Sequence, residues 1–379
     1  MKIMLASQYD AADSDSWSGI PHAVATSLRK LGVDLAGQEP LPEGAWSLPL
    51  KSFQLGSRIL SGTEMLRERH PLITASYARA MNQRTRRHRS DAILSLGTLP
   101  LANLHPESPP AFIWTGSTWA SMCDYYPEFA HTSRRSSDTA HRVERAAIDN
   151  AAHIFAASSW ARDSLLSDYA IAPDKVSVAP WGGPEPSAQT MPGPDAKVLR
   201  LLAVGRSWHR KGMDLACEVA AQIRDSGRRC QLDIVGALPP RNLVTDPDTR
   251  THGWLSKRDP HQRRTLQALY SRATALLVLS RAEAYGQVIN EAASIGLPTV
   301  ASDTGGLGST IRDYRLGKVV SLDESASRAT AAILELVDNE RDYLEMRESI
   351  RASYADNLTW RAVVSSVISI IERESRAPE

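Results

Sequence analysis

The sequence predicts an α/β protein with two domains, each built around a mainly parallel sheet. Short β-rich runs alternate with longer helical patterns along almost the whole length, which is typical of βαβ units. The chain has 379 residues, a length that suits two domains better than one. Between Trp181 and Lys197 the chain is rich in Pro and Gly and can neither continue a helix nor pair as a central strand, so we expect the domain boundary there.

In the first half, five apolar runs predict strands with helical patterns between them. The expected strands are residues 2–6, 92–96, 111–114, 153–157 and 176–179. We therefore expect an N-terminal domain over residues 1–182, followed by a linker over residues 183–197.

The second half repeats the alternation, which predicts a C-terminal domain over residues 198–355. Its expected strands and helices are strands 199–204, 230–235, 275–279 and 299–301, and helices 212–226, 260–270 and 287–295. The chain should end in a helix within residues 356–379, because apolar residues recur there at helical spacing. They are Val363, Val364, Val367, Ile368 and Ile371. This pattern predicts a helix that is buried along one stripe.

Composition narrows the class of protein. The formal net charge is +1, so the overall charge of the chain does not attract nucleic acid as a partner. Three cysteines without CxxC spacing argue against a disulfide framework and against a zinc site. No run of about 18 apolar residues is available to span a bilayer, and the apolar start is too short for a signal peptide. We therefore expect a cytoplasmic protein.

The strongest functional signal lies between residues 280 and 306. Glu283 follows a predicted strand in a short loop, and Glu291 lies about one turn into the next predicted helix. The free amides of Gly286, Gln287 and Val288 would form an anion site at the start of that helix. Carboxylates beside a phosphate are costly unless they accept hydrogen bonds, so the two glutamates are predicted to hold sugar hydroxyls. The alternative is that both are solvated residues near a helix start.

A second signal lies between residues 201 and 220, where a strand leads through a basic loop into a helix. Arg206 and Lys211 stand on this loop, at the end of the first strand of the second domain. Two cations in that position can neutralise a diphosphate. The alternative is a solvated basic loop.

Together these motifs resemble a known family. The E-x7-E spacing, the Tyr285-Gly286 step, the helix EAASIG, the strand LPTVAS and the loop DTGG are similar to the nucleotide-sugar motif of retaining family 4 glycosyltransferases of the GT-B fold. The resemblance implies that Glu283 contacts hydroxyls of the donor sugar and that Glu291 contacts the ribose. The expected catalytic residues are Glu283, Arg206 and Lys211, and the two cations are expected to stabilise the departing diphosphate.

The same resemblance sets expectations for the architecture and for the first domain. It implies two Rossmann-like domains facing each other across a cleft, with the C-terminal helix crossing back onto the first domain. Gly19 stands where family members approach the donor phosphates with a double glycine. Thr118, Trp119 and Tyr125 follow another strand and are candidates for the acceptor side.

The resemblance implies a retaining transfer of a sugar from a nucleotide-sugar, most simply a UDP-sugar, to a hydroxyl of a glycan, lipid or small molecule. A sugar-nucleotide epimerase or phosphorylase on the same fold, or a non-catalytic partner subunit, is the alternative. No cofactor or metal is expected. The two D-x-D strings, beginning at Asp13 and Asp246, lie in loops without the strand context of a metal-binding motif.

A run of arginines in the first domain offers one further expectation. The run predicts one basic helical stretch with only Glu68 against it. Its members are Arg67, Arg69, Arg79, Arg84, Arg86, Arg87 and Arg89. Such a face could hold an anionic acceptor or rest on an anionic membrane, with Arg67, Arg84, Arg86, Arg87 and Arg89 as contacts, so that the protein would be peripheral at the cytoplasmic membrane face. The alternative is a solvated basic helix.

Overall fold

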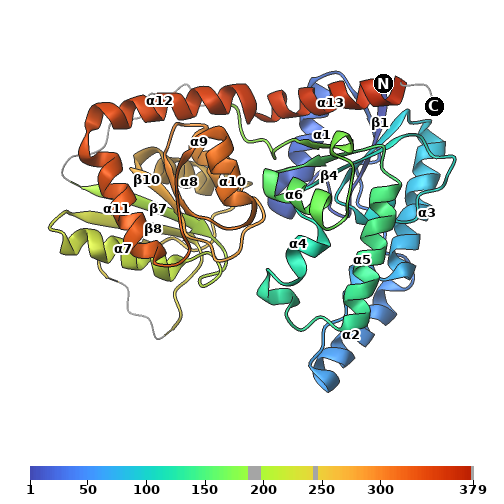
Figure 1. The fold of residues 1–379 in the computed structure, drawn as a ribbon, viewed down its shortest axis with the longest axis horizontal. Coiled ribbons are helices and arrows are strands. Elements are labelled where there is room, and N and C mark those ends of the chain that lie inside the picture. The colour runs from blue at the N-terminus through green and yellow to red at the C-terminus, as the bar shows by residue number, and fades with distance from the viewer. Residues whose placement is uncertain (187–197, 242–245, 377–379) are drawn as a thin grey trace. The chain divides into compact units, whose positions relative to one another are not determined.

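The structure is a computed structural model that describes residues 1–186, 198–241 and 246–376. Contacts within the chain divide it into two compact units (Figure 1). Unit 1 comprises Met1–Pro180 and Val363–Glu379, and unit 2 comprises Trp181–Ala362. Most of the expected linker, residues 187–197, lies outside the described residues.

Unit 1 is built on a six-stranded parallel sheet in the order β2-β1-β3-β4-β5-β6. The five strands expected from the sequence are confirmed, and the short edge strand β2 adds a sixth. β3 and β4 are buried at every residue, as strands covered on both faces should be. The strands are β1 (Lys2–Ala6), β2 (Asp34–Ala36), β3 (Ala92–Leu96), β4 (Ala111–Thr115), β5 (His153–Ala156) and β6 (Val176–Val178).

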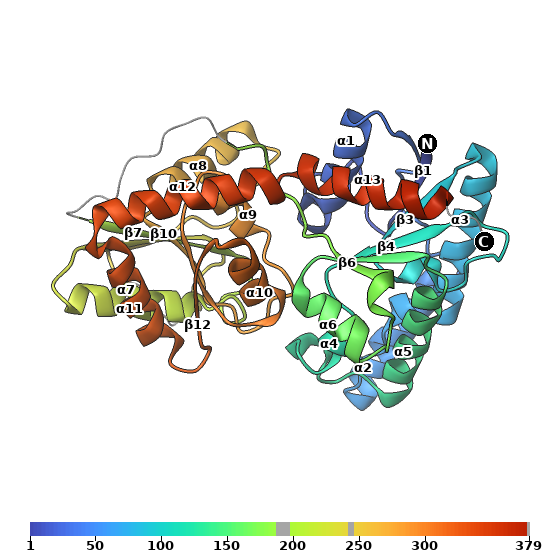
Figure 2. The same cartoon turned by 45° about the horizontal axis from the view of Figure 1, so that its top comes forward.

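Helices connect and cover these strands (Figure 2). Alternate residues of β1, Met4 and Ala6, share a buried apolar cluster with Ile73 and Tyr77 of α3, which fixes that helix on one face of the sheet. The α-helices of unit 1 are α1 (Ile20–Lys30), α2 (Ser47–Ser61), α3 (Pro71–His88), α4 (Trp119–Cys123), α5 (Arg134–Asp149) and α6 (Ser159–Ser167). The short 3-10 turns are η1 (Ser16–Gly19), η2 (Arg67–Arg69), η3 (Leu99–Leu101), η4 (Pro127–Phe129) and η5 (Pro173–Lys175).

Unit 2 repeats this plan with the strand order β12-β11-β10-β7-β8-β9, again parallel throughout. The chain runs outward from β7 to β8 and β9 on one side and from β10 to β11 and β12 on the other. The order therefore reverses between β7 and β10, where ligands of open α/β sheets bind. The strands are β7 (Leu199–Gly205), β8 (Cys230–Gly236), β9 (Thr249–Thr251), β10 (Ala275–Val278), β11 (Thr299–Ser302) and β12 (Gly317–Val320).

Both faces of the second sheet are covered. Leu201 of β7 belongs to a buried cluster with Val219 of α7, while its neighbour Leu202 belongs to another with Ile289 of α9. The helices are α7 (Met213–Asp225), α8 (Pro260–Arg272), α9 (Val288–Ala293), α10 (Gly305–Tyr314), α11 (Ser325–Asp338), α12 (Glu340–Asn357) and α13 (Trp360–Arg376). The helices expected from the sequence are confirmed, although α9 is shorter than residues 287–295.

The final helix α13 begins in unit 2 and is counted with unit 1 from Val363 onward. The predicted apolar stripe is buried at Val363, Val364, Val367 and Ile371, and Ile368 is half-buried. The periodicity of the sequence therefore located the buried face of this helix correctly. In the part of the chain that the structure describes, no helix is long and apolar enough to cross a membrane.

The prediction of a single basic helix between residues 67 and 89 was wrong. Arg67 and Arg69 form the separate turn η2, because Pro71 begins α3. Both side chains are largely buried and paired: Arg67 forms an ion pair with Glu43, and Arg69 lies over the Trp119 ring. They are therefore not available to a membrane or to an acceptor.

Candidate active site

Two loops of unit 2 that carry predicted site residues meet at the carboxyl ends of β7 and β10. Lys211, after β7, donates a hydrogen bond and forms an ion pair with Glu283, after β10, and both side chains are mostly buried. The Arg281 amide donates to the Arg210 carbonyl at 2.8 Å, which ties the backbones of the loops together. The structure thus brings a predicted cation and a predicted sugar-binding carboxylate into direct contact at the switch point of the sheet.

Gly212 allows this close approach. Its φ of 67° is in the left-handed region, and a Cβ at this position would lie 1.9 Å from the carbonyl oxygen of Leu279 at the end of β10. Any side chain would therefore clash with backbone, which cannot move aside as a flexible side chain could. The Lys211-Gly212 step opens α7 as the sequence predicted, and the glycine also lets the two loops pack.

Arg281 strengthens the same junction. Its guanidinium forms two hydrogen bonds with the Asp214 carboxylate, at 2.9 and 2.7 Å, and a third with the carbonyl of His209. Burial tends to raise the pKa of Asp214, but the hydrogen bonds and charge of Arg281 outweigh it and lower the pKa below its usual value. Sequence reasoning missed this pair, although an acidic residue in the first turn of α7 was a visible signal.

Arg206 lies in a different environment from Lys211. It is exposed, and its guanidinium carbon stands 3.7 Å from the centre of the Trp254 ring. Trp254 follows the edge strand β9 and is 51% exposed, which is unusual for so large an apolar side chain. The stack holds an always-charged guanidinium on a flat surface open to solvent. Sequence reasoning did not single out Trp254.

Glu291 lies in the first turn of α9 and is largely buried. Its carboxylate forms an ion pair with the more exposed Lys257, a residue that sequence reasoning did not select. Burial raises the pKa of the nearby Tyr270 hydroxyl well above its usual value, and the Glu291 carboxylate raises it further.

The start of α9 is anchored firmly. The Tyr285 hydroxyl donates to the carbonyl of Trp181 at 2.8 Å, and the side-chain amide of Asn290 donates to the same carbonyl at 2.6 Å. Hydrogen bonding along the helix begins with the Ile289 amide donating to the Gly286 carbonyl. The amides of Gly286, Gln287 and Val288 precede that first internal donor, as expected for a helix start.

In unit 1, the loop that contains Gly19 has an unusual backbone. Trp17, Ser18 and Gly19 all have positive φ values, and a Cβ on Gly19 would lie 2.7 Å from the Ser14 carbonyl oxygen. The Trp17 ring stacks on Tyr9 with 5.2 Å between ring centres. Two non-glycine residues in this region cost free energy, and such strain often marks a ligand-binding segment. The loop follows β1, at the carboxyl end of the sheet.

The structure places Thr118 and Trp119 in the interior. Thr118 is fully buried and caps α4 by accepting from the Ser121 amide, while its hydroxyl lies 2.6 Å from that of Ser164. Trp119 is also fully buried, and its amide donates to Glu144. The expected acceptor contacts of Thr118 and Trp119 therefore do not fit their positions. Tyr125 is half-buried and packs 5.5 Å from the Trp160 ring.

Glu144 organises the interior behind these residues. Its buried carboxylate accepts hydrogen bonds from the Thr98 hydroxyl at 2.9 Å and from the Tyr169 hydroxyl at 2.6 Å, in addition to the Trp119 amide. Arg69 lies 3.9 Å from the same carboxylate. A buried carboxylate with this many donors is a structural group.

The fold and the paired loops define a two-unit α/β protein of the GT-B class, with charged side chains gathered at the switch point of its second sheet. The sequence matches the family described as "Family 4 Glycosyltransferase in conflict systems" over residues 122–367. This match covers more than half of the chain, and the chain belongs to that family.

Individual proteins support the same placement. A D-inositol 3-phosphate glycosyltransferase of Corynebacterium aurimucosum is 27% identical over 256 residues, which cover 60% of this chain and 58% of the relative. The chain thus matches somewhat more than half the length of this curated relative. Among solved structures, sucrose-phosphate synthase from Thermosynechococcus elongatus aligns with a TM-score of 0.71 at 18% identity, over 98% of each chain. Anabaena HepE, solved with UDP and glucose, aligns with a TM-score of 0.65 at 14% identity, over 98% of this chain and 100% of that one.

Proposed function

We propose that the protein is a retaining glycosyltransferase that moves a sugar from a nucleotide-sugar, most simply a UDP-sugar, to an acceptor hydroxyl. The observation that carries the proposal is the contact between Lys211 and Glu283 at the switch point of the unit 2 sheet. The sugar and the diphosphate of a nucleotide-sugar are joined by a single bond. A site that holds this bond must therefore place a cation for the diphosphate beside a carboxylate for the sugar. A solvated loop would not bury both side chains.

The proposed reaction proceeds on one face of the donor sugar. The bond between the anomeric carbon and the diphosphate oxygen breaks, the acceptor oxygen bonds to the same carbon from the same side, and the acceptor proton passes to the departing diphosphate. Lys211 and Arg206 stabilise the charge that grows on the diphosphate, and no protein nucleophile is required. Glu283 accepts hydrogen bonds from hydroxyls of the sugar.

The remaining donor contacts follow from the same arrangement. Glu291 is proposed to accept from the ribose hydroxyls, and the amides of Gly286, Gln287 and Val288 to donate to phosphate oxygens. Gly19 is proposed as a backbone contact to the donor, since a glycine carries no side chain of its own that would stand in the way. On the acceptor side Tyr125 remains the only one of the three sequence candidates that we propose, for a glycan, lipid or small-molecule acceptor.

A thermal-shift series with UDP-, GDP- and ADP-sugars tests the proposal. A ligand that binds only the folded protein must raise the melting temperature, so we expect the UDP-sugars to give the largest increase. The sugar that stabilises most is then supplied with candidate acceptors, and the anomeric configuration of the product is read by NMR. An inverted product, release of a free epimer, or turnover that requires inorganic phosphate would contradict a retaining transfer.

We expect turnover to continue in excess chelator. Arg206, Lys211 and the helix amides already supply the positive charge that a divalent cation would bring to the diphosphate. The carboxylates of Asp13 and Asp246, the first residues of the two D-x-D strings, accept hydrogen bonds from backbone amides two residues further along. Loss of turnover in chelator that Mn²⁺ or Mg²⁺ restores would show that one of these strings binds metal.

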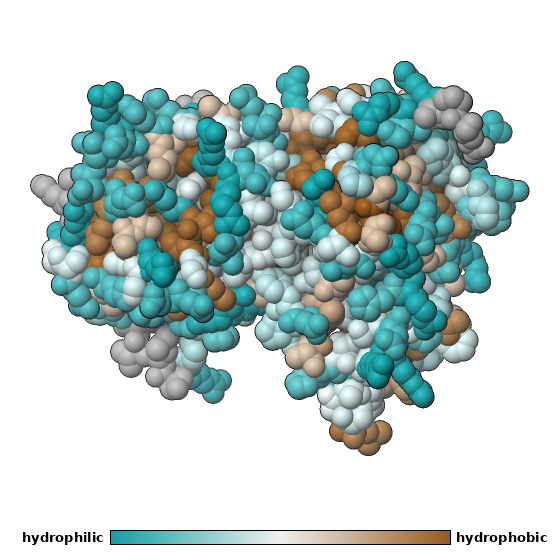
Figure 3. All heavy atoms as spheres, in the orientation of Figure 1, coloured by the Kyte–Doolittle hydropathy of each residue, from teal (hydrophilic) through white to brown (hydrophobic). Residues whose placement is uncertain are grey.

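We also propose a peripheral contact with anionic membrane, carried by α2. This helix exposes five large apolar side chains, contains Lys51 and Arg58, and has no acidic residue. The five are Leu48, Phe53, Leu55, Ile59 and Leu60. Figure 3 shows apolar surface at its tip. An amphipathic helix of this composition suits a lipid interface.

The arginines named from the sequence contribute unequally to such a contact. Arg67 is paired with Glu43, and Arg84 donates to the backbone carbonyls of Glu39 and Pro40. Arg86, Arg87 and Arg89 are exposed. We therefore assign the apolar contact with the membrane to α2. These three exposed arginines are proposed to contribute only electrostatic attraction to anionic lipid.

Vesicle sedimentation separates the two parts. We expect the double variant F53S/I59S to lose binding to anionic vesicles, because it removes buried apolar area at the lipid interface. Replacing Arg86 and Arg87 with Gln should weaken binding only at low salt, an effect that is screened at about 0.3 M salt. Neutral vesicles are the control. Equal binding to both vesicle types by all variants would contradict a membrane contact through α2.

A further inference from the structure

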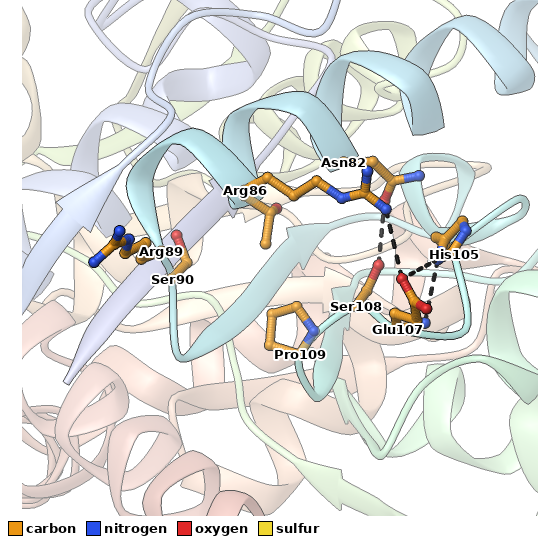
Figure 4. A pocket seen from close by; sticks show the side chains of 9 residues that line it. Asn82, Arg86, Arg89, Ser90, His105, Glu107, Ser108 and Pro109 are labelled. Atoms are coloured by element: carbon orange, nitrogen blue, oxygen red, sulfur yellow. Dashed lines mark hydrogen bonds and ion pairs between the residues drawn. The ribbon is translucent and has the colours of Figure 1, made fainter.

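Unit 1 has a hollow of about 260 Å³ at the end of α3 (Figure 4). Its lining comes from the last turns of α3 and from the loop before β4. Because β3 begins at Ala92 and β4 at Ala111, these segments stand at the amino ends of the strands. Gly19 and Thr118 follow the carboxyl ends of β1 and β4, on the opposite edge of the same sheet. The hollow is therefore separate from the edge at which parallel sheets bind their substrates.

Two buried hydroxyls in the lining have no hydrogen-bond partner within the described residues. They belong to Thr85 and Ser90, which are 6% and 9% exposed. The backbone around them is satisfied, since the Thr85 carbonyl accepts from the amides of Arg89 and Ser90. Buried hydroxyls in folded proteins are nearly always hydrogen-bonded, so this pair indicates a place for a polar ligand.

The charged side chains around the hydroxyls favour an anion. Figure 4 shows Arg89 beside Ser90 at one end of the lining, and Arg86 extended toward Glu107 at the other. The Arg86 guanidinium lies 3.6 Å from the Glu107 carboxylate, and both side chains are mostly exposed, so this ion pair is weak and can open. The helix dipole places roughly half a negative elementary charge at the C-terminus of α3, which repels an anion. The positive charge of the two guanidinium groups is larger than this.

A second hollow, of about 610 Å³, adjoins the first and shares Asn82, Arg86 and His105 with it. It adds the amide side chains of Gln83 and Asn103. Amides can donate to hydroxyl groups and accept from them, whereas they offer little to an apolar surface. The two hollows together provide cations and hydroxyls at one end and amides at the other.

We propose that this pair of hollows binds a phosphomonoester with a hydroxyl-bearing body. The phosphate accepts from the hydroxyls of Thr85 and Ser90 and pairs with Arg89, and Arg86 turns from Glu107 to reach it, while the body lies among the amides of the second hollow. A phosphate has three terminal oxygens, enough for two guanidinium forks and two hydroxyl donors, whereas a carboxylate has only two. Glu107 competes with the phosphate for Arg86.

Calorimetric titration with inorganic phosphate and with glucose 6-phosphate tests this site, with UDP present throughout to occupy the proposed donor site. We expect both probes to bind saturably and glucose 6-phosphate to bind more tightly. Arg89→Gln and Ser90→Ala should each weaken binding, by about tenfold for the lost charged hydrogen bonds of the arginine. Glu107→Gln should strengthen binding, a change of opposite sign that a purely structural role would not give.

Arg87→Gln is the matched control, because Arg87 is exposed on the same helix but lines neither hollow. The variant should leave the affinity for both probes unchanged. A loss of affinity equal to that of Arg89→Gln would mean that a basic surface attracts the probes without a specific site, and would overturn the proposal. Ser90→Ala removes a hydroxyl without a partner, so its melting temperature without phosphate should not fall. Phosphate should then raise the melting temperature of the variant less than that of the wild type.

A lipid headgroup could supply the same phosphomonoester, so vesicles containing phosphatidic acid form a further arm. Vesicle binding that depends on Arg89 and Ser90, together with weak binding of glucose 6-phosphate, would assign the phosphate to a lipid. Saturable binding of glucose 6-phosphate with the same dependence would assign it to a soluble ligand. Absence of saturable binding in every arm, or binding that Lys211→Ala abolishes and Arg89→Gln leaves intact, would overturn the proposal.

Discussion

Replacing Arg206 or Lys211 with Ala is expected to lower kcat about 100-fold, with a smaller change in the KM for the donor. Both cations follow β7 and would face charge that grows only as the bond to the diphosphate breaks. Interactions that strengthen in the transition state act on kcat, whereas uniform binding acts on KM. The measurement is steady-state kinetics with the nucleotide-sugar identified by thermal shift.

The two variants differ in how they disturb the fold. Arg206 is exposed, so its removal should leave the melting temperature nearly unchanged. Lys211 neutralises the mostly buried Glu283, so Lys211→Ala should also destabilise unit 2. Arg206→Lys should restore activity only in part, since an ammonium reproduces neither the two-pronged contact with phosphate nor the flat stack on Trp254.

The double variant R206A/K211A should lose less than the product of the single losses if both cations act on one diphosphate. His209→Gln is the matched control, because His209 is an exposed residue of the same loop. Single variants that retain the wild-type kcat, or a control that loses as much as they do, would contradict the assignment to the leaving group.

The local patterns of this sequence predicted the sheets well. Strands such as β3 and β4 are short apolar runs between helical patterns, and their burial on both faces follows from that composition. The short edge strands β2, β9 and β12 were missed because a three- or four-residue strand with mixed polarity has no distinctive pattern. The arginine run was misjudged although Pro71 marked the true start of α3 and should have excluded Arg67 and Arg69 from the helix.

The candidate site shows a different limit. Glu283 and Lys211 were both selected, each from its own motif, but their contact across 72 positions depends on the pairing of β7 with β10. Trp254 and Lys257 follow β9, whose existence the sequence did not reveal, so their places beside Arg206 and Glu291 could not be predicted. Partners supplied by a third segment of chain become visible only once the sheet order is known.

Thr118 shows how a local rule can override a positional expectation. Its place after β4 suggested a ligand contact, yet Ser121 three residues later forms a reciprocal cap with it at the start of α4. A hydroxyl that caps a helix already uses its hydrogen-bonding capacity. The T-x-x-S pattern was visible in the sequence and favoured the structural role.

Glu283→Gln and Glu291→Gln are expected to separate sugar transfer from nucleotide binding. Glu283→Gln should lower transfer by at least about 100-fold while UDP binds as before, because only the sugar loses its acceptor. A neutral Gln also cannot neutralise the charge of Lys211. Lys211 would then hold the diphosphate more strongly in the ground state, which favours retention of UDP. The measurements are the rate of transfer and the calorimetric affinity for UDP alone.

Glu291→Gln should instead weaken UDP itself, by about tenfold if one charged hydrogen bond to the ribose is lost. Its partner Lys257 is about half exposed, so breaking that ion pair should cost little stability, and the change in UDP affinity can be read without a folding correction. Glu335→Gln is the control, because it makes the same substitution in a more exposed glutamate that forms an ion pair with Lys318 away from the site. If Glu283→Gln and Glu291→Gln lost UDP affinity equally, both carboxylates would have to contact the nucleotide, and the division between sugar and ribose would fail.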